Sequence, residues 1–337
     1  MRPPPSLIPL ILRPTPLTLH HLTPMLNPTR LNTTIAQRRV HLLARSLTTA
    51  SGTGDGGTAV NTVNPASVAC VIIGDEVLGG KTLDTNSHFL AKKCFDHGLD
   101  LKRIVVVPDI TEDIAQTVRE MSASYGIVFT SGGIGPTHDD ITYPSIAHAF
   151  SLPLHHDTRT LELMRKLTPR KDGKEVEMTD ARKRMAWVPY GEEVKVVHPC
   201  EGLWVPVVGV RNVWILPGIP RLFERLLTAV LPTLLPPASS HPALYIRVQI
   251  GTILPESTIA PALTSIQARA APDGIKVGSY PKWQRHPVRP GGDGLDGGKG
   301  RPGVVVSLVG TDREVVERWA EVVRGEVDGW VVEGDED

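Results

Sequence analysis

From residue 65 onward, short runs of β-branched residues alternate with amphipathic segments, and this alternation is the strongest constraint on the fold. Three runs are predicted to be strands, at residues 68–73, 104–107 and 126–130. Between them, one helix is predicted from Asn86 and a second is predicted to be capped by Thr111. Strands that alternate with helices in this way are typical of α/β folds with parallel strands. The sequence therefore predicts a mainly parallel sheet.

The remainder of this first domain is predicted from turn and apolar patterns. Thr142 is expected to cap a further helix, and residues 204–210 and 212–216 are expected to form paired strands. Pro217-Gly218-Ile219-Pro220 then opens a helix to Leu231, and the Pro- and Ser-rich residues 232–242 are expected to be a linker. The tryptophans Trp187, Trp204 and Trp214 are expected in the core. This domain is predicted to span residues 65–235.

A second, smaller domain is predicted for residues 243–334. Its predicted order is strand, helix, strand, strand, helix, strand, which is typical of a ferredoxin-like α+β fold. The corresponding ranges are 244–250, 257–270, 275–280, 304–309, 312–324 and 330–332. Residues 281–302, between its middle strands, are dense in Gly and Pro and are expected to be a disordered insertion.

The first 54 residues differ from the rest of the chain in composition. They contain no Asp, Glu or Lys, but they carry six arginines, and they are rich in Ser and Thr. An acid-free, Arg-rich N-terminus is typical of a mitochondrial transit peptide, so the protein is expected in the mitochondrial matrix. A disordered Pro-rich tail is the alternative. Both interpretations exclude residues 1–54 from the fold.

Overall charge and cysteine use exclude several classes of protein. Lys and Arg number 36, as do Asp and Glu, so no broad basic surface for nucleic acid is expected. The three cysteines are widely spaced and form no C-x-x-C pair, which argues against a disulfide framework or a cysteine zinc site. No apolar stretch reaches the ~18 residues that a membrane span needs, so no membrane partner is expected.

A glycine-rich loop followed by two acids is the main candidate for chemistry. Residues 130–140 read Thr-Ser-Gly-Gly-Ile-Gly-Pro-Thr-His-Asp-Asp and lead from a predicted strand into a helix. Glycines let backbone amides approach an anion, and a helix start adds partial positive charge. Carboxylates about 4 Å apart repel by ~4 kcal/mol at an effective dielectric constant of about 20, which a cation or a shared proton relieves. The loop matches neither G-x-G-x-x-G nor a Walker loop. It predicts a phosphate site with a metal nearby.

Further acids follow the other predicted strands. Asp75 and Glu76 come after the first strand, and Asp109 comes after the second. Ligands of open α/β sheets bind beyond the carboxyl ends of the strands, so these acids and the glycine loop are expected to converge on one crevice. Carboxylate oxygens are the ligands that hard cations prefer. The alternative is that each acid only caps a helix or lies in a solvated turn.

Five motifs occur in order between residues 65 and 231, and together they carry a resemblance to a known family. They are Val71-Ile72-Ile73-Gly74-Asp75-Glu76, Asp84-Thr85-Asn86, Val106-Val107-Pro108-Asp109, the run from Gly132 to Thr142, and Leu216-Pro217-Gly218-Ile219-Pro220. The chain resembles the molybdopterin-binding-like (MoaB/Mog) family. Within it, the chain is most similar to the N-terminal domain of eukaryotic FAD synthase and to the bacterial competence-damage-inducible protein. Gly278-Ser279-Tyr280-Pro281 is similar to the small domain that follows in FAD synthase.

The resemblance implies a three-layer α/β domain that often trimerises, so a homotrimer or dimer is expected. In the flavin-linked branch it implies hydrolysis of FAD to FMN and AMP with Mg, Mn or Co, and in the bacterial branch hydrolysis of ADP-ribose-type pyrophosphates. The implied residues are Asp139, Asp140 and Asp109 for catalysis; Gly132, Gly133, Gly135, Thr137, Thr85, Asn86, Pro217 and Gly218 for substrate; and Asp75, Glu76 and Asp140 for metal.

Two other hypotheses stay open. The adenylyltransferase branch, which activates molybdopterin, usually carries Arg-Asp where this chain has Asp139-Asp140. A molybdopterin-binding or molybdopterin-adenylylating protein is therefore the second hypothesis. A non-catalytic flavin- or nucleotide-binding protein is the third. No ATP-binding synthetase pattern follows the small domain, so FAD synthesis itself is not expected.

Overall fold

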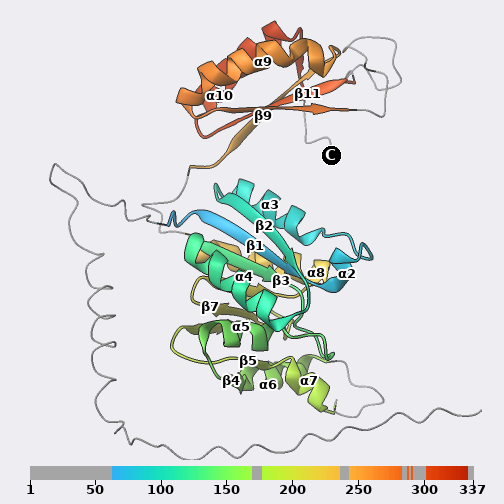
Figure 1. Cartoon of the computed structure of the whole chain (residues 1–337), viewed down its shortest axis with the longest axis vertical. Helices are drawn as coiled ribbons and strands as arrows, with labels where there is room; N and C mark the ends of the chain where they lie inside the picture. Colours follow the sequence, from blue (N-terminus) through green and yellow to red (C-terminus); the bar gives the residue numbers. More distant parts are fainter. Residues whose placement is uncertain are drawn as a thin grey trace, which may run out of the picture. The chain divides into compact units, whose positions relative to one another are not determined.

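The computed structural model describes residues 63–168, 177–235, 243–282, 287, 290 and 301–332 (Figure 1). The predicted leader, the end of the predicted linker and most of the predicted insertion lie outside the described residues, so those interpretations stay predictions. Within the described ranges, no helix is both long enough and apolar enough to cross a membrane.

A six-stranded sheet with the order β2-β1-β3-β8-β7-β6 forms the centre of the larger fold. Its neighbours β2, β1, β3 and β8 run parallel, whereas β8, β7 and β6 pair antiparallel. The predicted, mainly parallel sheet is thus confirmed, including the pairing of the last two predicted strands. The bounds are β1 (Ser67–Ile73), β2 (Asp100–Val107), β3 (Ile127–Ser131), β6 (Val194–Val197), β7 (Val207–Val210) and β8 (Val213–Leu216).

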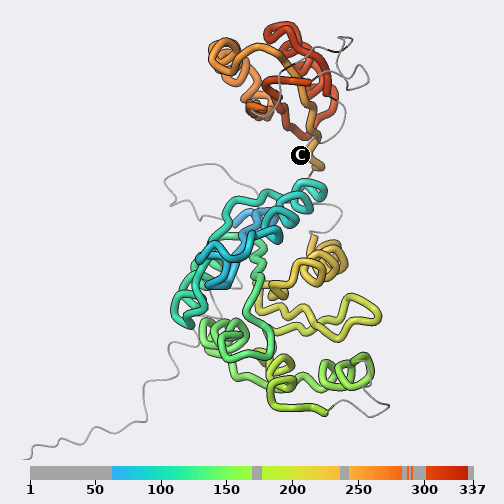
Figure 2. The backbone as a smooth tube through the Cα atoms, turned by 90° about the vertical axis from the view of Figure 1, so that its right-hand side faces the viewer, coloured from blue at the N-terminus to red at the C-terminus, as the bar shows by residue number. Residues whose placement is uncertain are grey.

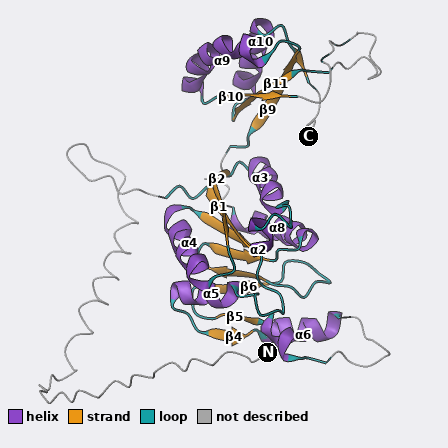
Figure 3. Ribbon diagram, turned by 45° about the vertical axis from the view of Figure 1, so that its right-hand side comes forward, coloured by secondary structure: helices purple, strands orange, loops and turns teal. Residues whose placement is uncertain are grey.

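Helices cover both faces of this sheet, which makes three layers (Figure 3). Helices α3 and α8 pack on one face, and α4 and α5 pack on the other. Alternate residues of β1 divide between the two cores, with Cys70 and Ile72 toward α3 and α8, and Val71 and Ile73 toward α4 and α5. An uninterrupted apolar run is required because both faces of the strand are buried. The helix bounds are α3 (Asn86–Asp96), α4 (Thr111–Ser124), α5 (Thr142–Phe150) and α8 (Pro220–Leu234).

Several short elements were not predicted from the sequence. They are α2 (Asp75–Leu78), α6 (Thr158–Leu167), α7 (Asp180–Arg184), and the antiparallel pair β4 (Leu154–His156) and β5 (Trp187–Pro189). Strands of three residues are too short for a period-two pattern to be recognised.

The residues after 243 form a second sheet with the order β10-β11-β9-β12, and all its pairs are antiparallel. The chain order is β9, α9, β10, β11, α10, β12, so the ferredoxin-like fold is confirmed (Figure 2, orange to red). Its own apolar core includes Ile259, Leu308 and Val316. The bounds are β9 (Ile246–Thr252), α9 (Glu256–Ala270), β10 (Lys276–Pro281), β11 (Val304–Gly310), α10 (Arg313–Glu326) and β12 (Trp330–Val331).

Three predicted helix ends are wrong. The residues that cap α4 and α5 are Ile110 and Ile141, and neither cap makes a side-chain hydrogen bond. Thr142 begins α5 instead, and its hydroxyl donates to the Gly132 carbonyl at 2.8 Å, which ties the helix to the glycine loop. Helix α8 continues through Pro232 to Leu234. Pro232 removes one backbone hydrogen bond, and the helix ends two residues later.

Candidate active site

Four parallel strands end at the same edge of the sheet, and each delivers a short polar or glycine-rich segment. Strand β1 leads into Gly74 and helix α2, and β2 leads into Pro108 and Asp109. Strand β3 leads into the glycine loop, and β8 leads into Pro217 and Gly218. The four segments meet because the strands are neighbours and point the same way.

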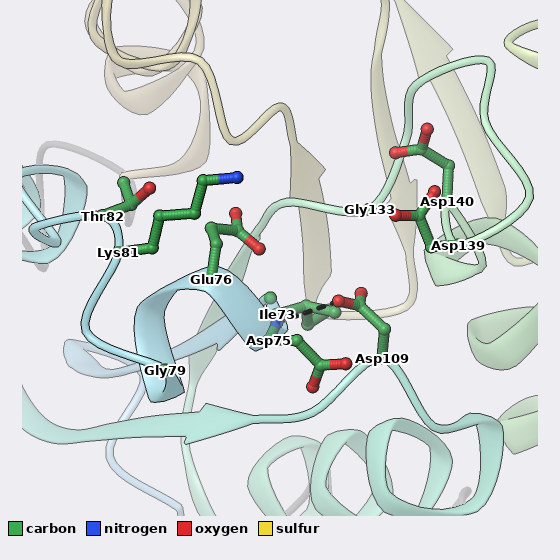
Figure 4. A pocket seen from close by; sticks show the side chains of 11 residues that line it. Ile73, Asp75, Glu76, Gly79, Lys81, Thr82, Asp109, Gly133, Asp139 and Asp140 are labelled. Carbon is green, nitrogen blue, oxygen red and sulfur yellow. Dashed lines mark hydrogen bonds between the residues drawn. The ribbon is translucent and has the colours of Figure 1, made fainter.

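A pocket of about 640 Å³ lies among three of these segments (Figure 4). Five carboxylates from separate strand ends contribute to its wall, which is the convergence expected from the sequence. The lining residues are Ile73, Gly74, Asp75, Glu76, Gly79, Lys81, Thr82, Asp109, Gly133, Asp139 and Asp140.

The carboxyl of Asp109 has a raised pKa in this pocket. Burial raises the pKa of its carboxyl, and the negative charges of Asp75, Glu76 and Asp139 raise it further. The backbone amide of Asp75 opposes this shift by donating to Asp109 Oδ2 at 3.0 Å. The ionised form of Asp109 is therefore disfavoured in the folded protein, mainly because the carboxyl is partly buried and further because like charges surround it.

The carboxylate of Asp140 holds the glycine loop together. Its Oδ1 accepts the Gly135 amide at 2.6 Å, and its Oδ2 accepts the amide and the hydroxyl of Thr137 at 2.8 and 2.6 Å. A Cβ at Gly135 would lie 2.5 Å from Oδ2, so only glycine allows this approach. Thr137, which was predicted to bind substrate, thus stabilises the loop through its two hydrogen bonds to Asp140.

Asp139, the neighbouring acid, faces solvent. Hydrogen bonding from Thr137, with the charges of His138 and Arg184, lowers the pKa of its carboxyl. His138 is almost fully exposed, and its Nδ1 lies 4.0 Å from Asp139 Oδ1. Asp139 is therefore an ionised carboxylate at the mouth of the pocket.

The glycine loop approaches β1 very closely. Gly132 has a φ of 113°, and a Cβ on it would lie 2.1 Å from the Ile73 carbonyl oxygen. Its amide donates to the Leu216 carbonyl at 3.2 Å. The Gly135 amide donates to Asp140. Between Gly132 and Gly135, the amides of Gly133 and Ile134 have no hydrogen-bond partner within the part of the chain that the structure describes.

Lys81 is a candidate site residue that the sequence reasoning did not select. It follows α2 in the turn Gly79-Gly80-Lys81 and extends along the pocket beside Glu76 (Figure 4). Among the residues that line this pocket, it is the one with a permanent positive charge. The available signal was a lysine directly after two glycines and close to two acids.

A second, mostly apolar pocket of about 420 Å³ lies beside the glycine loop. It shares Glu76, Gly133 and Asp140 with the acidic pocket. Its other lining residues are Gly132, Ile134, Gly135, Pro136, Tyr143, Met185, Trp204, Val205, Pro206, Pro217, Gly218, Ile219 and Leu222. A charged compartment thus adjoins an apolar one. Trp204 lines this pocket, although the sequence placed it in the core, and Trp187 is 41% exposed.

Three predicted substrate residues, Thr85, Asn86 and Thr137, lie outside both pockets. Asn86 is buried, and its Nδ2 donates to Ser131 Oγ at 2.9 Å and to the Gly218 carbonyl at 2.8 Å. It joins the end of β3 to the turn after β8. Thr85 is exposed at the start of α3 and lines neither pocket.

Comparison with known proteins places this geometry in a family. Residues 69–236 match the family model described as "Probable molybdopterin binding domain". Protein PH0439 of Pyrococcus horikoshii is 32% identical over 220 residues, which cover 63% of this chain and 83% of that protein. The chain belongs to the molybdopterin-binding-domain family.

Two further similarities are partial. A "Probable FAD synthase" of Caenorhabditis briggsae is 33% identical over 231 residues, which are 64% of this chain but only 43% of that protein. The chain therefore spans less than half the length of this relative. The crystal structure of the protein CinA from Thermoplasma acidophilum covers 50% of this chain and 98% of its own, with a TM-score of 0.45 and 29% identity.

In this family member the acidic pocket fits a hard divalent cation shared with a ligand. Among the described residues, no three His, Cys, Asp or Glu side chains lie close enough to hold a metal ion by themselves. Mg²⁺, however, is usually bound by one or two carboxylates together with substrate phosphates and water. The donors are all oxygens, and a cation would offset the negative charges that add to burial in raising the pKa of Asp109.

The raised pKa of Asp109 predicts that a neutral side chain at this position stabilises the fold. Because the folded-state pKa is raised, ionised Asp109 destabilises the fold above the unfolded pKa of about 3.9 and has no such effect well below it. Asp109→Asn keeps an oxygen for the Asp75 amide and removes the charge. We expect a higher melting temperature than wild type at pH 7 and no difference near pH 3, measured by circular dichroism without divalent metal.

Asp96→Asn, at the exposed end of α3, is the matched control and is expected to leave the melting temperature unchanged. A lower melting temperature for Asp109→Asn at pH 7 would contradict the account of repulsion in the pocket.

Proposed function

We propose that this protein is a divalent-metal-dependent hydrolase of nucleotide pyrophosphates and that FAD, cleaved to FMN and AMP, is its leading substrate. The observation that carries the proposal is the pocket in which acids from two strand ends face the glycine loop, with Lys81 on its wall. Acids, a lysine and the free Gly133 amide in one pocket suit a diphosphate together with a metal ion.

Asp75 and Glu76 would hold the cation, with oxygens of the substrate diphosphate completing its ligands. They are the better candidates because both oxygens of the Asp140 carboxylate already accept hydrogen bonds in the loop. A bound divalent cation supplies Lewis-acid neutralisation of charge on phosphate oxygens.

The protein's own groups account for the remaining chemistry. Lys81 Nζ and the Gly133 amide in the acidic pocket, with the Ile134 amide in the adjoining pocket, stabilise negative charge on the phosphate oxygens. Asp109 accepts a proton from the attacking water, and its raised pKa makes it a stronger base than an ordinary carboxylate. The water oxygen bonds to one phosphorus while the bridging P–O bond breaks, and FMN and AMP leave with one phosphate each.

The apolar pocket supports a substrate that carries an aromatic ring system. It opens beside the same glycine loop, and Trp204, Met185 and Leu222 give it apolar walls. Pockets that take small molecules are typically concave and apolar, with a few polar groups. One ring system of FAD is proposed to bind there while the diphosphate lies in the acidic pocket.

The relatives support a flavin in particular through their names. The "Probable FAD synthase" of Caenorhabditis briggsae matches 64% of this chain, and its name refers to FAD. Since the chain covers 43% of that protein, its whole activity is not transferred here. Hydrolysis of the diphosphate bond of the same flavin nucleotide is the part proposed for this chain.

A molybdopterin-handling transferase is the second candidate, because the family description names a pterin ligand. A pterin is also a planar heterocycle and suits the apolar pocket. This candidate requires ATP-dependent adenylation, whereas the hydrolase requires only water and metal. A non-catalytic binder is distinguished by calorimetry, since it would bind FAD saturably and release no FMN over hours.

Asp75→Asn tests the acidic pocket directly. Loss of a cation ligand is expected to lower kcat for FMN release about a hundredfold or more, and to weaken the apparent affinity for Mn²⁺. The assay separates FAD, FMN and AMP by chromatography in the presence of Mg²⁺, Mn²⁺ or Co²⁺, with EDTA as the metal-free arm.

Asp96→Asn again serves as the control and is expected to retain full activity. Wild-type protein that forms no FMN with any of the three metals would remove the flavin assignment. Full activity of Asp75→Asn would remove this residue from the metal site while leaving the substrate assignment intact.

Trp204→Ala tests the ring pocket. Loss of a large apolar contact is expected to raise KM for FAD about tenfold, with a smaller effect on a ring-free diphosphate diester such as dimethyl diphosphate. Trp187→Ala, on strand β5 and outside both pockets, is the control and is expected to behave as wild type. Equal effects on both substrates would contradict ring binding at Trp204.

The mitochondrial matrix is the proposed location, on the composition of residues 1–54. Fusion of these residues to a fluorescent reporter is expected to direct it to mitochondria, and replacement of the six arginines by glutamine is expected to prevent import. Cytosolic fluorescence of the unmodified fusion would leave the Pro-rich tail as the better interpretation.

A further inference from the structure

Arg184, at the end of α7, reaches the glycine loop from a distant part of the chain. Its Nη2 donates to the main-chain carbonyl of Asp140 at 3.1 Å, across 44 residues of sequence. The contact is partly buried, and it reaches the residue whose carboxylate closes the loop. Asp140 is thus held by its side chain from inside the loop and by its carbonyl from outside.

The base of Arg184 is well fixed. Ala186, two residues later, is fully buried, and its carbonyl accepts the Asp157 amide at 2.8 Å. Met185, between them, lines the apolar pocket. The guanidinium therefore extends from a backbone segment that packing and hydrogen bonding hold in place. A planar guanidinium with several donors also keeps its direction better than a flexible ammonium does.

The position of the Asp140 backbone determines two other features. It orients the carboxylate that binds the amides of Gly135 and Thr137, and it sets where the preceding residue, Asp139, stands at the mouth of the acidic pocket. Misplacement of catalytic groups by about 1 Å can cost a hundredfold in rate. A restraint on this carbonyl is therefore a restraint on the acidic pocket.

We propose that Arg184 is a positioning residue that fixes the acid-bearing end of the glycine loop through the Asp140 carbonyl. It acts on the geometry of the site without holding substrate. Its importance for turnover rests on the proposed function, whereas its effect on the loop does not.

Hydrogen exchange tests the effect on the loop without any substrate. In Arg184→Ala, exchange in peptides spanning residues 133–140, which contain the Gly135 and Thr137 amides, is expected to be about tenfold faster than in wild type. Arg184→Lys is expected to be intermediate. Arg182→Ala is the matched control, because Arg182 lies on the same helix and donates to the Glu177 carbonyl instead.

Kinetics with FAD and metal give the second readout. Arg184→Ala is expected to lower kcat about tenfold with little change in KM, Arg184→Lys to recover part of the loss, and Arg182→Ala to match wild type. Unchanged exchange in Arg184→Ala overturns the proposal, and a rise in KM alone would then identify Arg184 as a substrate contact. Faster exchange in a protein that does not cleave FAD supports the positioning role and removes only the flavin assignment.

Discussion

Like-charge repulsion among carboxylates at the tips of parallel strands is the constraint on which this site depends. Asp75, Glu76, Asp109 and Asp139 crowd one pocket, and their repulsion adds to burial in raising the pKa of Asp109. A fold gains no stability from this arrangement, because the same positions filled by neutral side chains would remove the repulsion. Such crowding is typical of sites that bind cations or move protons.

The architecture explains how the crowding arises and why it persists. Parallel neighbours β2, β1 and β3 end at one edge, so residues far apart in sequence meet without long loops. Strands β1 and β3 are buried on both faces, and the two cores resist rearrangement of the edge. The Asn86 side chain joins two of the strand ends, and Thr142 ties α5 to the glycine loop. The repulsion is thus held in place by packing and by hydrogen bonds outside the pocket.

The parts predicted from the sequence are those governed by local pattern and by chain direction. Buried strands appear as apolar runs, and strands joined by helices must run parallel, so the meeting of Asp75, Asp109 and the glycine loop followed from topology. The order of elements likewise predicted the ferredoxin-like fold, as the strand order confirms.

The parts that were missed depend on tertiary contacts. That Asp140 and Asn86 bind ligands stays a prediction, and the structure adds hydrogen bonds of their side chains that hold the loop and the strand ends. Sequence pattern cannot reveal that Arg184 reaches Asp140, or that Trp204 lines a pocket, because both depend on how distant segments pack. Thr142 resembles a cap by residue type, yet its hydroxyl meets a carbonyl of the loop.

The two adjoining pockets differ in character, so they suit different parts of one ligand. The acidic compartment suits a diphosphate and a cation, and the apolar one suits a ring, while the glycine loop borders both. The most direct measurement of this account is a crystal structure with Mn²⁺ and α,β-methylene-ADP, a non-hydrolysable diphosphate analogue. The account predicts an anomalous Mn²⁺ peak beside Asp75 and Glu76, with phosphonate oxygens at the Gly133 and Ile134 amides. An analogue bound elsewhere, or a pocket without Mn²⁺ at saturating concentration, would contradict it.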